Sequence, residues 1–105
     1  MIDVIVIDSV NQKIYQDTIG EGIKDYYKHL DCRCFDVVGF PFGDVYVDDE
    51  GMYNAHCGFQ LPGYNPLFGN GVITGPCDSE GGSTSVTISL AEVGSMIEFW
   101  RKGCM

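Results

Sequence analysis

The sequence predicts an α+β fold in which two α-helices pack on a mixed or mostly antiparallel sheet of five to six strands. Short β-branched segments with a two-residue period recur along the chain, Gly- and Asp-rich turns separate them, and two segments place apolar residues at helical spacing. A length of 105 residues corresponds to one hydrophobic core, so we expect a single domain over residues 1–105.

The predicted strands follow from the alternation of apolar and polar residues. Residues 2–8 are β-branched on both faces, which is typical of a strand in the middle of a sheet. Residues 13–17 alternate after a short turn, so we expect them to form a hairpin with the first strand. Further strands are expected at residues 34–40, 71–75 and 84–88. The last of these is expected at a sheet edge, which allows a monomer or a homodimer.

Residues 43–57 form the segment around which we expect the sheet to be organised: a strand, an acidic turn and a returning strand. Val45 and Val47 point to one face of the first strand. The other face takes Asp44, Tyr46 and Asp48. Carboxylates that bond their own backbone and a glycine that can adopt positive φ make the turn. The turn residues are Asp48, Asp49, Glu50 and Gly51.

Two helices are expected on this sheet. The first covers residues 18–31 and begins at Thr18, with an acidic residue three positions later to complete a capping box. The second begins at a capping box formed by Ser89 and Glu92, and its apolar residues keep helical spacing as far as Trp100. We therefore expect this C-terminal helix to place the indole on the core.

The composition limits the classes of partner. Fifteen acidic residues against six basic ones give a formal net charge of −9. Because affinity for a phosphate backbone comes from clustered Lys and Arg, we expect no direct binding to nucleic acid. The charge favours a basic protein, or a protein that itself binds nucleic acid, as the partner. Solubility alone is the simpler explanation of the same charge.

The sequence also indicates a cytoplasmic location. The longest apolar run, within residues 2–7, is too short to span a bilayer, and no basic segment precedes an apolar one as in a signal peptide. The five cysteines are an odd number without an export signal, which favours reduced thiols. We therefore expect a cytoplasmic protein that does not bind membranes.

The cysteines raise the alternative of a small zinc-stabilised domain. The candidate ligands are Cys32, Cys34, His56, Cys57 and Cys77. The first two are spaced C-x-C rather than C-x2-C, and the adjacent His56 and Cys57 would point to opposite faces of a strand. We therefore predict free thiols, with zinc as the alternative.

The sequence shows no recognisable catalytic constellation. A Ser or Cys nucleophile needs a neighbouring base, and only His29 and His56 can supply an imidazole. There is no G-x-S-x-G elbow, and the acidic residues do not follow the order of a calcium-binding loop. We therefore expect a protein that is not an enzyme and carries no cofactor.

The segment 58–70 is the best candidate for function. Its prolines and glycines leave it without a helical or strand period, yet it carries several aromatic residues. These residues either fold inward as a lid over the sheet or form an interface, with Tyr64 at the loop tip as the exposed anchor. The residues predicted to mediate an interaction are Asp44, Asp48, Asp49, Glu50, Phe59, Tyr64 and Phe68.

A small-ligand or nucleotide-signal binding protein is the alternative from another class. In that case Lys24, Lys28 or Arg33 would hold a phosphate group, and Tyr64 or Phe68 would stack on a base. The glycine-rich stretch that follows lacks the Lys-Ser/Thr pair of a Walker loop, which favours tight turns there instead.

Several stretches together resemble one known family. They are Cys-Phe-Asp-Val-Val at 34–38, Val-Tyr-Val-Asp-Asp-Glu-Gly at 45–51, Gly-Val-Ile-Thr-Gly at 71–75 and the Ser-Leu-Ala-Glu-Val helix start at 89–93. The pattern is similar to a family of short uncharacterised proteins from phages, prophages and other bacterial mobile elements, grouped as a domain of unknown function. The resemblance covers nearly the whole chain and implies a compact α+β protein.

The resemblance also implies a function, since small acidic proteins of such elements often bind and disable host machinery. We therefore expect a non-enzymatic inhibitor of a host protein in the bacterial cytoplasm. A CRISPR or other defence component that binds nucleic acid is one candidate target.

Overall fold

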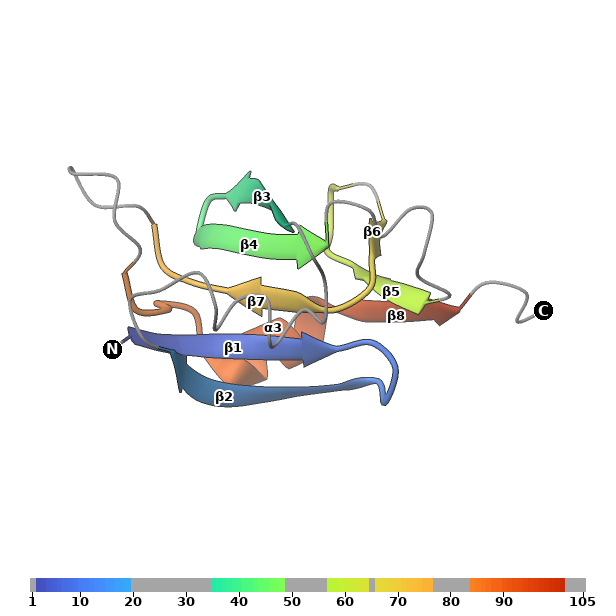
Figure 1. Cartoon of the computed structure of the whole chain (residues 1–105), viewed down its shortest axis with the longest axis horizontal. Helices are drawn as coiled ribbons and strands as arrows, with labels where there is room; N and C mark the ends of the chain where they lie inside the picture. Colours follow the sequence, from blue (N-terminus) through green and yellow to red (C-terminus); the bar gives the residue numbers. More distant parts are fainter. Residues whose placement is uncertain (1, 20–34, 49–56, 65, 77–83, 102–105) are drawn as a thin grey trace.

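The computed structural model describes residues 2–19, 35–48, 57–64, 66–76 and 84–101, and these form two antiparallel sheets and one short helix (Figure 1). The larger sheet contains β1 (Ile2–Asp8), β2 (Lys13–Ile19), β3 (Phe35–Phe40), β4 (Gly43–Asp48) and β7 (Gly71–Ile73). The smaller sheet contains β5 (Cys57–Gln60), β6 (Leu67–Phe68) and β8 (Glu98–Arg101), and the helix is α3 (Leu90–Met96). The strand orders are β2-β1-β7-β4-β3 and β6-β5-β8.

The predicted fold class, two helices on one sheet of five to six strands, is wrong. More than half of the described residues lie in strands, these strands form two sheets, and α3 is the one helix among them. Thr18 and Ile19 extend β2 instead of starting a helix, and the remainder of the first predicted helix lies outside the described residues. The second predicted helix ends at Met96.

The C-terminal helix is shorter than predicted because the chain becomes extended at Ile97, where φ is −78° and ψ is 141°. The residues that follow pair with β5 along the whole of β8, from Cys57 opposite Arg101 to Gln60 opposite Glu98. Trp100 therefore reaches its position from a strand. Ser89 is confirmed as the N-cap of the predicted capping box, since the Glu92 backbone N–H donates to Ser89 Oγ at 3.1 Å, and the Ser89 hydroxyl donates to Glu92 Oε1 at 3.2 Å.

The central position predicted for the first strand is confirmed. β1 pairs with β2 on one side and β7 on the other, and its middle residues, Val4 to Ile7, are at most 2% exposed. Ile5 and Ile7 belong to the core on one face of the large sheet, whereas Val4 and Val6 belong to a second cluster on the other face. Burial on both faces accounts for the absence of alternation in this strand.

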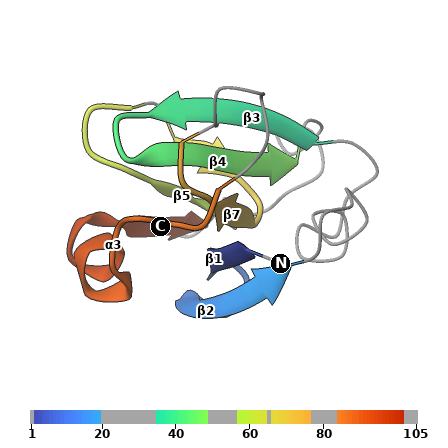
Figure 2. The ribbon, with the colours of Figure 1, turned by 90° about the vertical axis from the view of Figure 1, so that its left-hand side faces the viewer.

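The small sheet and α3 lie on the same side of the large sheet, as the two views together show (Figure 2). The core between these layers takes Phe59 from β5 and Val93 from α3, and both side chains are fully buried. A Cβ atom at Gly71 in β7 would lie only 2.7 Å from Cζ of Phe59. The missing side chain at Gly71 therefore provides the space into which the phenyl ring packs.

The hairpin predicted over residues 43–57 does not form as expected. β4 pairs with β3 across a turn at Pro41 and Phe42, and its other neighbour is β7, while Cys57 begins β5 in the small sheet. Gly43 enables the tight turn because its φ is 148° and a Cβ atom there would lie 2.1 Å from the Thr74 carbonyl oxygen. Residues 49–56 lie outside the described residues.

The other strand predictions have mixed outcomes. Strands at residues 13–17, 34–40 and 71–75 are confirmed with small shifts in their ends. Residues 84–88 are not a strand. They cross the sheet with isolated hydrogen bonds, including one from Val86 N to Asp3 O at 2.8 Å. The segment 58–70, predicted to lack regular structure, contains most of β5 and all of β6.

Candidate interaction surface

The candidate surface is the outer face of the small sheet, which we define by Gln60, Phe68, Glu98 and Trp100. Residues directly opposite each other in antiparallel strands project to the same face. Gln60 is opposite Glu98, and Gly58 is opposite both Trp100 and Phe68. Phe59 alternates to the inner face and is fully buried. The outer face therefore combines two aromatic rings with an amide and a carboxylate.

The two aromatic rings pack on each other. Phe68 and Trp100 meet edge to face, with ring centroids 4.9 Å apart and an interplanar angle of 82°. The indole lies directly over Gly58, where a Cβ atom would be 2.5 Å from Trp100 Cζ2. Gly58 thus sets the position of the indole, and any larger residue there would displace it.

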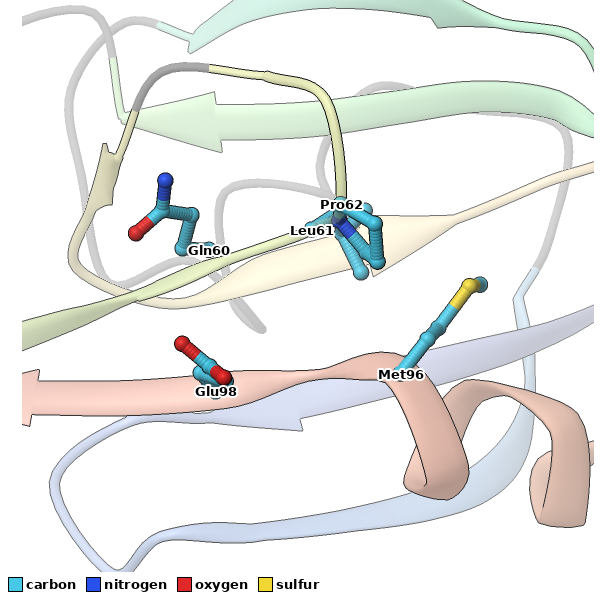
Figure 3. A pocket seen from close by; sticks show the side chains of 5 residues that line it. All are labelled: Gln60, Leu61, Pro62, Met96 and Glu98. Atoms are coloured by element: carbon cyan, nitrogen blue, oxygen red, sulfur yellow. The ribbon is translucent and has the colours of Figure 1, made fainter.

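Beside this aromatic pair is a hollow of about 180 Å³ between the small sheet and the end of α3 (Figure 3). Gln60 and Glu98 project from neighbouring strands, and Met96 extends from the end of α3 towards Pro62. The lining residues are Gln60, Leu61, Pro62, Met96 and Glu98. Among the described residues, the lining of the hollow therefore comprises three apolar side chains and two polar ones.

Tyr64 lies in the turn between β5 and β6 and is held in place by both backbone and ring contacts. Its N–H donates to the Leu61 carbonyl at 3.2 Å, and its own carbonyl accepts from Gln60 Nε2 at 3.0 Å. The Tyr64 ring packs 4.0 Å from that of Phe40, centroid to centroid. The side chain nevertheless remains 37% exposed. A fixed, partly exposed tyrosine is suited to serve as an anchor in an interface.

The predicted interaction residues do not form one cluster. Phe59 is fully buried and supports the surface from beneath, as in the lid interpretation of this segment. Asp44 is half-buried in β4, and its carbonyl accepts from Thr74 N at 2.9 Å. Asp48 ends β4 opposite Phe35. Asp49 and Glu50 lie outside the described residues.

Tyr64 and Asp44 nonetheless lie near the same turn. Phe40, which contacts the Tyr64 ring, pairs with Gly43, and the next pair joins Gly39 to Asp44. Phe68 is the other predicted residue on the candidate surface, through its contact with Trp100. The structure thus brings the aromatic loop and one predicted acid to the β3–β4 hairpin.

Sequence reasoning missed the residues that give the surface its polar character. Gln60, Met96 and Glu98 come together only through the pairing of β5 with β8, which joins positions far apart in the chain. The two consecutive aromatic residues within 98–101, a residue type enriched in strands, were a signal for this strand. The competing helical spacing that ends at Trp100 concealed it.

The candidate metal ligands are largely outside the described residues. Cys57 is buried at the start of β5, whereas Cys32, Cys34, His56 and Cys77 are not described. No group of three His, Cys, Asp or Glu residues is placed to hold a metal within the described ranges. A second hollow, of about 300 Å³, lies beside β1 and β2 and is lined by Asp3, Gln16, Asp17 and Thr18.

These features define a small protein of two packed antiparallel sheets with an aromatic and polar surface on the smaller one. The chain belongs to the family described as Domain of unknown function (DUF3846), whose model matches residues 2–99. This finding confirms the resemblance to an uncharacterised domain family. Comparisons with curated proteins and with solved structures give no match. None of the described helices has the length and hydrophobicity needed to cross a bilayer.

Proposed function

We propose that this protein is a non-enzymatic binding protein that engages a partner protein through Tyr64 and the outer face of the small sheet. The observation that carries the proposal is the fixed exposure of Tyr64. Tyr64 is 37% exposed, yet its ring packs on Phe40, and its backbone N–H and carbonyl make hydrogen bonds that hold the turn in place. An aromatic anchor that is already ordered loses little conformational entropy on binding, which favours affinity.

The charge of the chain supports a partner with a basic surface. A formal net charge of −9 raises the rate of encounter with positively charged proteins and opposes binding to nucleic acid itself. A protein that binds nucleic acid carries the complementary basic surface. Such a protein is therefore the partner class that we propose.

The narrower proposal concerns origin and effect. The resemblance to short proteins of phages and other mobile elements motivates the hypothesis that the partner is a host protein in the bacterial cytoplasm. In this hypothesis binding inhibits the partner, and a defence component such as a CRISPR effector is a candidate. The protein acts by covering a basic surface of the partner.

The experiment compares three forms of the protein in affinity capture from bacterial lysate: the wild type, Tyr64→Ala and Tyr15→Ala. Tyr15 lies on β2 and is also 37% exposed, so its substitution is a matched control for loss of an exposed tyrosine ring. We expect the wild type and Tyr15→Ala to capture the same protein, and Tyr64→Ala to bind it at least about tenfold more weakly.

The captured protein is then purified, and its own activity is measured with and without the wild type. Loss of that activity supports inhibition. Identical capture by all three forms, despite matching circular dichroism spectra, would contradict a role for Tyr64. A small molecule or zinc ion retained in native mass spectrometry, with no protein captured, would instead support the ligand-binding or zinc-stabilised alternative.

A further inference from the structure

Two of the side chains that line the hollow, Gln60 and Glu98, carry hydrogen-bond acceptors. The Gln60 amide can turn either its nitrogen or its oxygen towards Tyr64. Because a backbone carbonyl only accepts, the bond of 3.0 Å to the Tyr64 carbonyl requires the nitrogen on that side. The Gln60 oxygen is thereby directed away from Tyr64 and, on a side chain that lines the hollow, is available as a hydrogen-bond acceptor.

Glu98 supplies the second acceptor and is the one formally charged residue among the described residues that line the hollow. It lies directly opposite Gln60 in the β5–β8 pair, so the two side chains leave the same face of the sheet. Its side chain is exposed, and an ionised carboxylate accepts hydrogen bonds without donating any. A group that donates several hydrogen bonds and carries positive charge therefore complements both side chains.

The remaining walls suit a hydrocarbon stem. Leu61, Pro62 and Met96 line the hollow, and Met96 extends from the end of α3 (Figure 3). The thioether side chain of methionine adapts to irregular partners, which favours contact with a flexible aliphatic chain. Side chains with an aliphatic stem and a cationic head are those of Arg and Lys.

We propose that this hollow binds an arginine side chain of the partner protein. The inference rests on the proposed function, because it names the residue type that the partner inserts beside Tyr64. The planar guanidinium has five donors in a fixed fork, so it can bond the Glu98 carboxylate and the Gln60 oxygen at the same time. The net charge of −9 favours the approach of such a group.

The test uses N-acetyl-arginine methylamide as the probe and the Met96 methyl group as the reporter. Protein labelled with ¹³C at the methionine methyl groups is titrated, and the Met96 signal is assigned from its loss in Met96→Leu. We expect a saturable shift with a dissociation constant on the order of 1–10 mM, as befits one side chain. The neutral isostere N-acetyl-citrulline methylamide should bind at least about tenfold more weakly, since it lacks the charge.

Two variants test the polar contact. Glu98→Gln removes the charge at nearly constant shape and should weaken arginine binding at least about tenfold. Asp3→Asn removes one charge at an exposed position on β1 and should change the affinity less than about twofold. Equal weakening by both variants would overturn the proposal, because it would show long-range attraction without a site. Equal binding of N-acetyl-lysine methylamide would overturn the preference for guanidinium.

The outcome is separable from that of the proposed function. If the captured partner binds Glu98→Gln as tightly as it binds the wild type, the arginine inference fails while the role of Tyr64 stands. If the probe binds as described but Tyr64→Ala captures the same proteins as the wild type, the hollow is an arginine site and the proposed function fails.

Discussion

At the scale of single residues, the contact between Phe59 and Gly71 joins the two sheets. Phe59 comes from the small sheet and is fully buried, and Gly71 lies in the middle strand of the large sheet between Ile7 and Val47. A Cβ atom at Gly71 would lie 2.7 Å from Cζ and 2.9 Å from Cε1 of the phenyl ring. The layers can approach each other because one position in the large sheet has no side chain.

This contact predicts the behaviour of Gly71→Ala. The added methyl group would overlap with the Phe59 ring, which is enclosed in the core, so we expect a loss of about 1–3 kcal/mol in the free energy of unfolding. Urea unfolding followed by circular dichroism measures the change. The backbone itself does not oppose the substitution, because Gly71 is not among the glycines with positive φ.

A second substitution distinguishes this overlap from a general intolerance of alanine in β7. Phe59→Leu shortens the side chain that would meet the new methyl group. A double-mutant cycle measures the effect. Gly71→Ala should lower the free energy of unfolding by at least about 1 kcal/mol less in the Phe59→Leu background than in the wild type. Additive losses would contradict the packing of Phe59 over Gly71.

At the scale of elements, α3 shows how much a local signal can determine. The helix has seven residues, and its start depends on Ser89, whose hydroxyl accepts from the Glu92 N–H at 3.1 Å and contacts Glu92 Oε1 at 3.2 Å. A helix of this length has little intrinsic stability. Its cap and the burial of Val93 against the large sheet therefore contribute most of what holds it.

We predict that Ser89→Ala lowers the free energy of unfolding by about 1 kcal/mol, within a range of roughly 0.5–2 kcal/mol. Gly94→Ala in the same helix should act in the opposite direction, by about 0.5–1 kcal/mol, because alanine favours the helix. A Cβ atom at Gly94 would lie 3.5 Å from Ile14 Cδ1, an ordinary contact. Equal unfolding midpoints for both variants in urea would contradict the assignment of the cap.

The same element shows where sequence patterns stop being informative. The N-cap signal is local, and Ser89 was predicted correctly as the N-cap. The end of the helix was predicted wrongly, because apolar residues at helical spacing continue to Trp100, while the adjacent aromatic residues Phe99 and Trp100 are equally typical of a strand. The choice depends on β5, whose four residues pair with β8 across a long separation in sequence. Neither segment alone contains a pattern that predicts this pairing.

Local sequence patterns likewise predict only part of the candidate surface. Tyr64 could be predicted as exposed because it lies between glycine and asparagine in a turn. Gln60 and Glu98 could not be identified as neighbours, since nothing in either local sequence specifies the register that places them opposite each other. The prediction for Phe59 stayed open between a lid and an interface because the segment lacks a visible period, whereas its strand directs it to the core.

At the scale of the whole molecule, the dominant electrostatic feature is the excess of negative charge. Fifteen acids and six bases share a chain of 105 residues, so folding brings like charges together at the surface. Dissolved salt shortens the range of this repulsion, to about 10 Å at 0.1 M and about 3 Å at 1 M ionic strength. Stability at neutral pH should therefore depend on ionic strength.

We predict that the midpoint of thermal unfolding at pH 7 rises when NaCl is increased from 10 mM to 500 mM. The Debye length is about 30 Å at the lower concentration and a few ångströms at the higher one. Each kcal/mol of relieved repulsion corresponds to about 4–8 °C in a domain of roughly this size. Differential scanning calorimetry on wild-type protein measures the shift directly, without any substitution.

The control for this prediction uses pH, because NaCl can also change stability through effects unrelated to net charge. Near the isoelectric point of about 4.3 the formal charges balance, so screening has little net repulsion to relieve. The rise in midpoint should therefore be several-fold smaller at that pH than at pH 7. An equal rise at both values would mean that salt acts on apolar burial instead. The negative charge that favours a basic partner would then have little effect on the stability of the free protein.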